Sequence, residues 1–459
     1  MRIEIQNKTI SISGYTELFA KNLREALTFT DKAKEYQLRR MTNNIYTRFS
    51  PLVKKLESEI EVCLVNESDG VITIPAGFAY MFSGESVVDM RKDTGVKVAY
   101  PWIKKPFDLR PYQREAVDAM KQHRRGLVTL ATGLGKTLCA THLIREIGKR
   151  ALIVCPSQSI ADNFFAQLSE TFGANKVGMF GGGKKQIRDI TVGIAMSVNN
   201  HVDKFKAHDL GLIVQDETHR IAADTFYNIV SNLGDVGRIY GMTATDFRSD
   251  GKDLLLNAAV GQVVIDRDLV WGIQNGWLAK PTIVQRHVET TGHNYKDDKL
   301  KNYKSHVLNS DEMNAKIVAD IQKSMAAGKS VLCLVDEKAH GRLLAEKVGL
   351  PFASGDDKNA RQYVEQLNKE QIQGLIGTDS LIGEGTDTQN VDVLILANFV
   401  ASKGVVYQNL GRGLRIYKGK DEVLIIDYKP MGSTMLSRHA DQRLKLFKGI
   451  TDNVFVKKS

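Results

Sequence analysis

The sequence predicts an α/β protein with two units of parallel sheet, each flanked by helices, behind a small mixed α+β segment at the N-terminus. The chain has 459 residues, which is too long for one hydrophobic core and suggests about three domains. Short apolar runs alternate with helical patterns twice along the chain, and this alternation is typical of parallel sheets with right-handed crossovers. One apolar run leads directly into a glycine-bearing loop and then into a helical pattern.

That loop lies in residues 127–140 and contains the sequence Ala-Thr-Gly-Leu-Gly-Lys-Thr. Glycines let backbone N–H groups close on phosphate oxygens, and the N-terminus of the following helix adds partial positive charge. We expect Lys136 to contact the β- and γ-phosphates of a nucleotide and Thr137 to ligate Mg²⁺. The alternative is an ordinary glycine-rich turn. The other nucleotide contacts expected from this loop are Thr132, Gly133 and Gly135.

The composition is that of an ordinary globular protein with a basic excess. Hydrophobic residues make up 42% of the chain, and no run approaches the roughly 18 apolar residues that a membrane span needs. The net charge is +10, and residues 401–459 hold twelve Lys/Arg against five Asp/Glu. This excess favours a polyanionic partner, although a basic stretch can also be a solvated surface.

Four cysteines, Cys63, Cys139, Cys155 and Cys333, lie far apart and form no C-x-x-C pair. A structural metal site is therefore not expected, and we interpret all four as buried free thiols in a reducing compartment.

Residues 1–98 are predicted to form an accessory domain. Residues 60–65 and 71–75 are β-prone and flank a turn at residues 66–70, which predicts a β-hairpin between them.

Two helical patterns, at residues 15–28 and 31–43, precede this predicted hairpin. Basic and aromatic residues of the second pattern and its continuation could form a face that contacts nucleic acid, although a plain surface is the favoured interpretation. These residues are Tyr36, Arg39, Arg40, Tyr46, Arg48, Phe49, Lys54 and Lys55.

A glutamine motif, Arg110-Pro-Tyr-Gln113, lies some twenty residues before the phosphate loop. A Gln amide can bind adenine with one donor and one acceptor. We therefore expect Arg110 and Gln113 to contact the nucleotide base.

Two consecutive carboxylates follow the apolar run at residues 212–215. Phosphoryl transfer needs one carboxylate to hold the metal and a second to orient or deprotonate the attacking water. We expect Asp216 to bind the metal and Glu217 to act on the water, while His219 couples the nucleotide state to the nucleic-acid side.

Polar residues follow several other apolar runs, at the edge of the predicted sheets where ligands bind in open α/β folds. The glycine-rich stretch 180–185 offers backbone amides and two cations to a phosphate, although a flexible loop is an equally good interpretation. The expected nucleic-acid contacts are Ser157, Gly182, Gly183, Lys184, Ser197 and Thr378.

The last motif is the segment 408–415. Arg412 and Arg415 lie three residues apart, which predicts that they share one face of a helix. Guanidinium groups presented to a γ-phosphate stabilise transition-state charge. Two surface arginines on a basic helix are the alternative for this segment alone.

Together these motifs resemble the superfamily-two DExH helicases over residues 107–415, in the order that the family has them. The resemblance is carried by the phosphate loop, Asp216-Glu-Thr-His219, Thr243-Ala-Thr245 and Gln408-x-x-Gly-Arg412-x-x-Arg415. Asp246 stands where members of the family usually have Pro.

The resemblance implies two RecA-like lobes, residues 99–279 and 280–459, that use ATP and Mg²⁺. It implies that Gln408, Arg412 and Arg415 complete the catalytic set with Lys136 and the two carboxylates. It further implies that Gly385 and Asp387 lie near the nucleotide, and that Thr243 and Thr245 couple hydrolysis to movement.

The motif details differ from those of DEAD-box RNA helicases and are most similar to DNA translocases, in particular UvsW-type phage helicases. The resemblance therefore implies a cytoplasmic DNA helicase, bacterial or in a phage-infected cell, that remodels branched or duplex DNA in replication, recombination or repair. Its implied activities are branch migration of Holliday junctions and fork regression, and its protein partners are unknown. The alternatives are an RNA helicase, the motor subunit of a restriction-type complex, and a non-catalytic nucleic-acid-binding scaffold.

Overall fold

The computed structural model describes residues 1–458 except 45, 219–220, 222, 234, 245–251, 297, 356, 358, 379–387 and 418–419. Contacts between Cα atoms group the chain into two units. The first unit contains Met1–Thr129 and Lys136–Asp266, and the second contains Leu130–Gly135 and Arg267–Ser459. Each unit is described by itself below.

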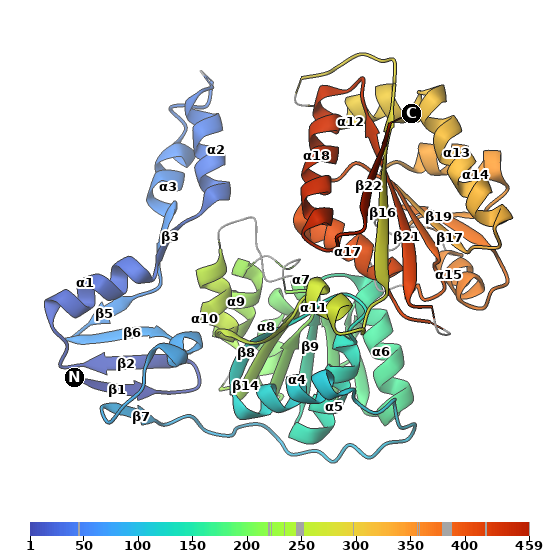
Figure 1. Cartoon of the computed structure of the whole chain (residues 1–459). Helices are drawn as coiled ribbons and strands as arrows, with labels where there is room; N and C mark the ends of the chain where they lie inside the picture. The colour runs from blue at the N-terminus through green and yellow to red at the C-terminus, as the bar shows by residue number, and fades with distance from the viewer. Residues whose placement is uncertain are drawn as a thin grey trace. The chain divides into compact units, whose positions relative to one another are not determined.

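The N-terminal part of the first unit contains a five-stranded sheet (Figure 1). Alternating isoleucines of its strands form one buried face with residues of helix α1 (Glu17–Ala26), as expected for a sheet with one solvated side. The strand order is β5 (Asn66–Ser68), β6 (Val71–Pro75), β2 (Thr9–Ser13), β1 (Arg2–Ile5) and β7 (Val87–Asp89), and the short helix η1 (Ala76–Met81) follows β6.

The predicted hairpin between residues 60–65 and 71–75 is wrong. Strand β4 (Glu61–Cys63) pairs instead with β3 (Thr28–Thr30), and β6 pairs with β5. Asp69 and Gly70 have φ angles of +53° and +73°, as a two-residue hairpin turn requires. That turn joins β5 to β6, so the upstream run is left to pair elsewhere.

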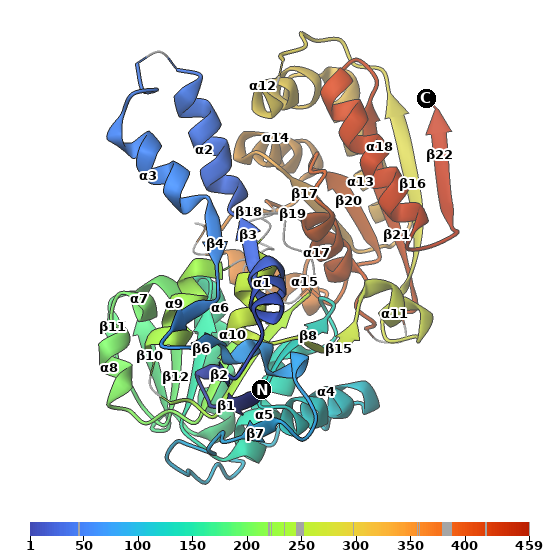
Figure 2. The same cartoon turned by 90° about the vertical axis from the view of Figure 1, so that its left-hand side faces the viewer.

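Two helices, α2 (Lys32–Thr42) and α3 (Pro51–Glu59), pack against each other and extend from the β3–β4 ribbon (Figures 1 and 2). Asp31 and Ser50 accept backbone N–H bonds at their N-termini. We call residues 31–59 the helical hairpin.

The remainder of the first unit is an eight-stranded sheet with flanking helices. Neighbouring strands from β10 to β8 are parallel, and β11 is antiparallel. Most residues of these parallel strands are fully buried, so they appear in the sequence as apolar runs. The strand order is β11 (Lys184–Lys185), β10 (Val177–Gly181), β12 (Ile190–Ile194), β9 (Ala151–Cys155), β13 (Leu212–Gln215), β14 (Arg238–Thr243), β8 (Arg125–Leu130) and β15 (Val263–Arg267).

The helices of this region follow the strands in the alternation that the sequence predicts. They are α4 (Pro111–Gln122), α5 (Lys136–Ile147), α6 (Gln158–Phe172), α7 (Ala195–Asn199), α8 (Val202–Lys206), α9 (Ala223–Asn232) and α10 (Asp253–Val260).

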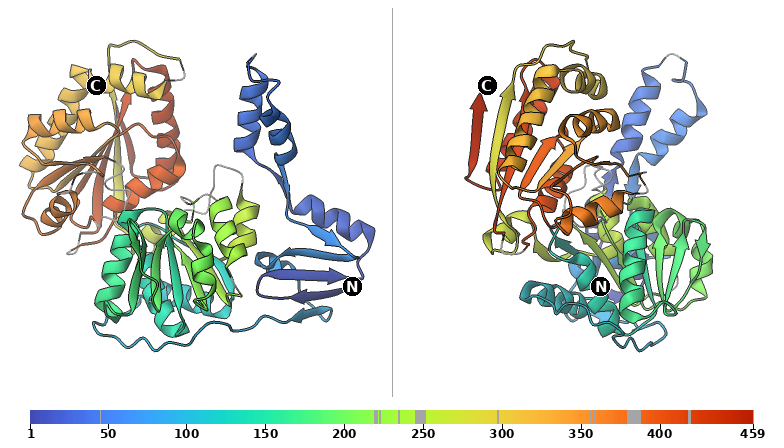
Figure 3. Two further views of the ribbon diagram at one scale, coloured as in Figure 1. Left: turned by 180° about the vertical axis from the view of Figure 1, so that it is seen from behind. Right: turned by 90° about the vertical axis from the view of Figure 1, so that its right-hand side faces the viewer.

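The second unit is built on a seven-stranded sheet in which every pair of neighbouring strands is parallel (Figure 3). The order is β18 (Phe352–Ala353), β19 (Gly374–Thr378), β17 (Val331–Val335), β20 (Val393–Ala397), β21 (Glu422–Pro430), β16 (Lys280–Val288) and β22 (Val454–Lys458). The helices are α11 (Leu269–Gln274), α12 (Lys299–Tyr303), η2 (Lys304–Leu308), α13 (Asp311–Ala326), α14 (Lys338–Val348), α15 (Ala360–Asn368), α17 (Lys403–Gly413) and α18 (Thr434–Lys448).

The two parallel sheets and their flanking helices confirm the predicted α/β class. None of the described helices combines the length and apolar composition that crossing a membrane requires. Cys63 is exposed, whereas the other three thiols are buried as expected. Cys63 differs because β4 belongs to a two-stranded ribbon, which buries little.

Candidate active site

The candidate site of the first unit lies at the carboxyl edge of its sheet. Strands β9, β13, β14 and β8 are neighbours and run parallel, so their C-terminal ends meet at one edge. Gln215 is opposite both Val154 and Gly241, and Thr243 is opposite Thr129. This register brings the carboxylates that follow β13 beside the Thr-Ala-Thr segment and the strand that enters the phosphate loop.

The phosphate loop joins β8 to α5. Gly133 and Gly135 have φ angles of +93° and +86°, which lie in the left-handed region that glycine adopts without a steric penalty. Helix α5 begins at Lys136, so Lys136 and Thr137 occupy its first turn. The loop therefore ends at a helix N-terminus, which is the arrangement that favours a bound phosphate.

Lys136 and Glu217 form an ion pair at this edge. Lys136 Nζ lies 3.2 Å from Glu217 Oε1, and the two side chains are 10% and 16% exposed. Glu217 has a φ angle of +46°, an uncommon conformation for a residue other than glycine. The preceding residue, Asp216, is buried, and its backbone N–H donates to the carbonyl of Val154 at 2.9 Å.

Thr218 connects the carboxylates to β14. Its backbone N–H and its hydroxyl each donate to the carbonyl of Met242 at 3.0 Å. Gly241 permits this approach, because a Cβ atom there would lie 2.9 Å from Thr218 Oγ1. The next residue of β14, Thr243, is buried at the end of the strand. No role was predicted for Thr218 from the sequence, although its position between the predicted site residues Glu217 and His219 could have identified it.

Gln113 has a structural role in addition to the one predicted. Its Oε1 accepts the backbone N–H of Arg110 at 2.9 Å, and its side chain is buried. This bond caps α4, whose first residue is Pro111. Arg110 is exposed, and contact of either residue with adenine remains a prediction.

The expected nucleic-acid contacts of the first unit lie together at the ends of β9, β10 and β12. A Cβ atom at Gly182 would collide with Oε1 of Gln158, in the first turn of α6, so the glycine loop and this helix are in direct contact. Gly181 likewise approaches the side chain of Ile194, the residue directly before α7.

The remaining side chains in this group present polar atoms. The buried hydroxyl oxygen of Ser157 has no hydrogen-bond partner among the described residues. Lys184 Nζ lies 5.5 Å from the ring centroid of Phe165, and Ser197 is half-buried in α7.

In the second unit, the two arginines do not share one helical face as predicted. Helix α17 ends at Gly413, and Arg415 forms an isolated β-bridge with Leu278. Glycines at positions 411 and 413 weaken the last turn, which favours this early end. Arg412 is buried in the helix, and burial lowers the pKa of Arg415 to about 10.

The phosphate loop is grouped with this second unit and contacts the arginine segment within it. A Cβ atom at Gly411 would lie 2.7 Å from Thr132 Cβ, and one at Gly133 would lie 3.2 Å from Arg415 Cγ. Gln408 lies on the same helix, half-buried, and Thr378 is buried at the end of β19. Four expected site residues lie outside the described residues: His219, Thr245, Gly385 and Asp387.

The residues gathered at this edge fit a magnesium nucleotide. The glycine cradle, the ammonium group of Lys136, the Thr137 hydroxyl and two carboxylates are the donor set that a triphosphate and Mg²⁺ require. Among the described residues, no group of three or more His, Cys, Asp or Glu side chains is arranged to hold a metal ion. A metal here would therefore need phosphate oxygens as ligands, as Mg²⁺ commonly does.

Comparisons with known proteins match the part of the chain that carries the phosphate loop and the two carboxylates. Residues 106–248 match the family described as "Type III restriction enzyme, res subunit". The putative mitochondrial ATP-dependent helicase irc3 of Schizosaccharomyces pombe is 26% identical, over 70% of this chain and 57% of the relative. The DNA 3'-5' translocase XPB2 of Sulfurisphaera tokodaii is 24% identical, over 78% of this chain and 89% of the relative.

The chain is therefore similar to superfamily-two helicases, and the matched family model covers residues 106–248. It spans 51–57% of the length of the first three curated relatives that it matches. The helicase MrfA bound to DNA matches 77% of this chain and 50% of its own chain, at 15% identity and a TM-score of 0.59. The match to T4 UvsW covers 100% of this chain and 99% of that chain, at 16% identity and a TM-score of 0.41. The MrfA likeness supports the fold predicted for a superfamily-two helicase, with tandem RecA-like lobes.

Proposed function

We propose that this chain is a superfamily-two helicase that hydrolyses ATP to move along DNA and to remodel branched DNA, as in branch migration and fork regression. The Lys136–Glu217 ion pair at the phosphate loop carries the proposal for ATP hydrolysis, because it brings a phosphate-binding cation to the carboxylate that would act on water. DNA is favoured as the polymer because the relative XPB2 is named a DNA translocase and the MrfA structure contains DNA.

Hydrolysis would begin with the exchange of a partner at Lys136. The γ-phosphate would replace Glu217 as the partner of the Lys136 ammonium group. The carboxylate of Glu217 would then be free to orient a water molecule and accept its proton. Thr137 and Asp216 would hold a magnesium ion, which would supply charge neutralisation at the phosphates. Arg412, Arg415 and Gln408 of the second unit would stabilise the charge that develops on the transferred group.

Movement along DNA would follow from the state of the nucleotide. Thr218 joins the segment that carries Glu217 to Met242, so a shift of the carboxylate on hydrolysis is transmitted to the start of the Thr-Ala-Thr segment. Ser157, the Gly181–Lys184 loop and Ser197 lie at strand ends of the same sheet and would bind the backbone of the nucleic acid. Thr378 would bind it from the second unit.

The test is ATP hydrolysis measured with single-stranded DNA, linear duplex, a four-way junction, a fork and RNA at matched nucleotide and salt concentrations. Stimulation at least several-fold greater by the junction or fork than by linear duplex is expected. Stimulation by RNA alone would contradict the proposed substrate and leave the hydrolytic mechanism standing. Absence of hydrolysis with every polymer would contradict the proposed function itself.

A further inference from the structure

The helical hairpin concentrates positive charge in an otherwise acidic region. Residues 31–59 contain seven Lys/Arg and four Asp/Glu, whereas the rest of the first hundred residues contain seven Lys/Arg and nine Asp/Glu. Arg39 and Lys34 pair with carboxylates of the hairpin itself. Among the described residues, Arg40, Arg48 and Lys54 form no ion pair, and all three are exposed. These cations are available to a polyanion.

Large aromatic side chains are exposed at the tip of the same hairpin. Tyr46 is 93% exposed and Phe49 is 83% exposed, and helix α2 buries no residue at all. Aromatic side chains normally bury a large apolar area, so two such rings in solvent indicate a surface that binds something. The guanidinium of Arg48 lies 4.7 Å from the centroid of the Phe49 ring, so charge and aromatic surface adjoin.

The turn that carries these rings is held by its own hydrogen bonds. Asn44 accepts the N–H of Tyr46 through its side chain at 2.9 Å and the N–H of Arg48 through its carbonyl at 3.0 Å. The hydroxyl of Thr47 donates to the carbonyl of Met41 at 2.9 Å. A tip that is ordered before binding loses less entropy when it binds.

Exposed rings beside unpaired cations are the combination that binds single-stranded nucleic acid, because bases stack on the rings and phosphates contact the cations. A duplex hides its base faces, so only unpaired bases can use the rings. We propose that the tip of the helical hairpin stacks unpaired bases of a branched DNA on Tyr46 and Phe49 while Arg40, Arg48 and Lys54 bind its phosphates. The inference rests on the proposed function, because it assumes that the chain acts on DNA.

The base of the hairpin is tied to the part of the first unit that follows the catalytic motifs. Lys252 Nζ lies 2.9 Å from Asp31, which caps α2, and it also pairs with Asp224 in the first turn of α9. Of the described helices, α9 is the first after Glu217, and α10, which Lys252 immediately precedes, is the first after Thr243. One buried ammonium therefore joins the hairpin to both segments.

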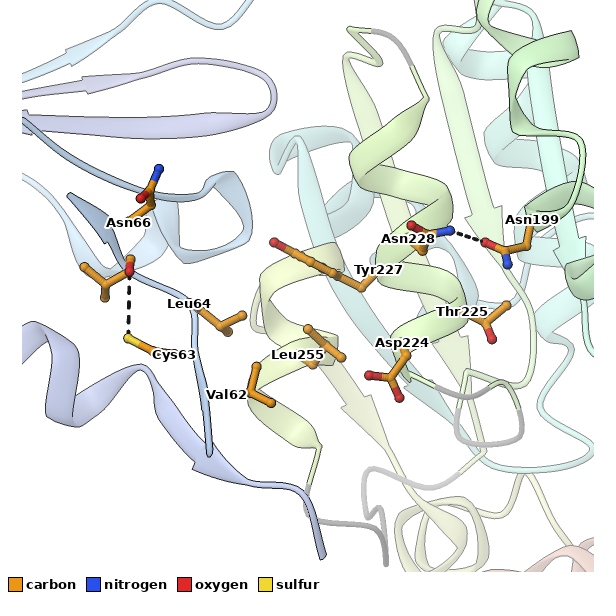
Figure 4. Close-up of a pocket in the computed structure, with 11 residues that line it drawn as sticks. Val62, Cys63, Leu64, Asn66, Asn199, Asp224, Thr225, Tyr227, Asn228 and Leu255 are labelled. Carbon is orange, nitrogen blue, oxygen red and sulfur yellow. Dashed lines mark hydrogen bonds between the residues drawn. The ribbon is translucent and has the colours of Figure 1, made fainter. Parts of the chain in front are cut away.

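A cavity of about 720 Å³ lies beside this ion-pair cluster (Figure 4). Val62, Cys63 and Leu64 line it from the β4 side, while Tyr227 and Leu255 line it from α9 and α10. Leu64 and Tyr227 also pack against one hydrophobic cluster, so apolar contacts join this region to α9 and α10 as well. Lys252 adds the ion pairs to Asp31 and Asp224, and we assign it as a positioning residue for the hairpin.

The first experiment measures binding of the full chain, without ATP, to a DNA fork with unpaired bases and to a blunt duplex. The double variant Tyr46→Ala/Phe49→Ala is expected to bind the fork about 10-fold or more weakly and the duplex within 2-fold of the parent. A 2-aminopurine placed at the unpaired position should lose its stacking-dependent fluorescence change in the same variant. The variant Tyr46→Phe/Phe49→Tyr retains both rings and should bind as the parent does.

Phe455→Ala is the matched control, because Phe455 is also an exposed aromatic residue, 53% accessible on β22. Fork affinity that is unchanged in the alanine double variant, while DNA still stimulates hydrolysis, would overturn the inference and leave the proposed function intact. The hairpin would then be a surface for a protein partner. Failure of the parent to bind or respond to any DNA would instead contradict the proposed function.

The second experiment varies the charges. Replacing Arg40, Arg48 and Lys54 by Gln should lower the slope of log affinity against log salt by about 2, because each lost phosphate contact removes about 0.7 from the slope for a single strand. Lys252→Met should retain fork affinity within 2-fold but lose several-fold of the fork-stimulated hydrolysis. An unchanged salt slope would overturn the role of the cations, and unchanged stimulation would overturn the role of Lys252.

Discussion

The ammonium group of Lys136 lies 3.2 Å from the carboxylate of Glu217, at the point where the phosphate loop meets the edge of the sheet. The two residues come from the first turn of α5 and from the segment after β13. Lys136 is predicted to bind the γ-phosphate, and Glu217 is predicted to act on the attacking water. In this structure they contact each other instead. The ion pair therefore holds both groups in place and must open when a nucleotide binds.

Glu217→Gln should lower the rate constant of ATP hydrolysis at least 100-fold, because the amide cannot accept a proton from water. The same variant should bind ATP about 2- to 5-fold more tightly, because Lys136 no longer leaves an ion pair worth roughly 0.5–1 kcal/mol. Single-turnover hydrolysis and equilibrium binding of a fluorescent ATP analogue measure the two effects separately.

Glu85→Gln is the control for this experiment, since Glu85 is an exposed carboxylate outside the site. Lys136→Ala should abolish nucleotide binding. Hydrolysis by Glu217→Gln at the parental rate would remove Glu217 from the mechanism.

Gly182 and Gly183 allow a paired test of the glycine loop. Both have left-handed φ angles, +56° and +82°, so Ala at either position should cost about 1 kcal/mol of the free energy of unfolding. Only at Gly182 would a Cβ atom displace the amide of Gln158, which donates to Asp162 at 2.7 Å. Gly182→Ala should therefore cost about 1 kcal/mol more than Gly183→Ala.

If this loop binds the backbone of the nucleic acid, Gly182→Ala should also lower DNA-stimulated hydrolysis several-fold more than Gly183→Ala does. Urea unfolding and stimulated hydrolysis provide the two measurements. Equal effects of the two substitutions on hydrolysis would argue against a binding role for this loop.

The order of elements in both sheets could be predicted from the sequence because buried parallel strands are continuous apolar runs. For example, the sequence Val331–Val335 is a continuous apolar run and predicts a strand, and it corresponds residue for residue to β17. The proximity of Lys136 to the carboxylates also follows from a general rule, because parallel strands present their carboxyl ends at one edge.

Features that depend on a competing local preference could not be predicted in this way. The three-residue spacing of Arg412 and Arg415 indicates one face only if the helix continues, and α17 ends between them. The partner of residues 61–63 was missed because the turn at Asp69 and Gly70 closes a shorter hairpin. The hydrogen bond between Thr218 and Met242 joins segments that are distant in sequence, so no local sequence pattern predicts it.

Arg443 and Asp427 form a fully buried ion pair in the second unit. Arg443 Nε donates to Asp427 at 2.9 Å, and Nη1 donates to the carbonyl of Val400, in the segment that leads to α17. Arg443→Met should lower the free energy of unfolding by about 3–5 kcal/mol, because it leaves a buried carboxylate without its partner. Adding Asp427→Asn should restore part of that loss, and a double-mutant cycle by urea unfolding measures the coupling.

The pH dependence of Arg443→Met gives an independent check. Burial raises the pKa of Asp427, and loss of the arginine removes a group that opposes this rise. The native variant should then bind a proton that the unfolded chain releases, so its stability should increase as the pH falls from 8 towards 5.5. A decrease over this range, relative to the parent protein, would contradict the assignment.

His340 should make the parent protein sensitive to acid. Its ring lies between the Tyr303 hydroxyl, 2.6 Å from Nδ1, and Asn314 Oδ1, 2.9 Å from Nε2. Burial lowers its pKa from 6.5 to about 4 in the native state. The unfolded chain therefore binds more protons than the native state between pH 6.5 and 4, so stability rises with pH across this window and is lost as the pH falls through it.

The full difference corresponds to roughly 3 kcal/mol at pH 4, at 1.36 kcal/mol for each unit of pKa. Urea unfolding at pH 7, 6, 5 and 4 should show a smaller loss of stability in His340→Gln than in the parent, because Gln does not titrate. His123→Gln is the control, since His123 is exposed and its substitution should leave the slope unchanged. Equal slopes for the parent and His340→Gln would show that His340 does not titrate differently in the native and unfolded states. The Tyr303 hydroxyl oxygen also lies 3.2 Å from the carbonyl oxygen of Ala397, the last residue of the strand that leads to α17.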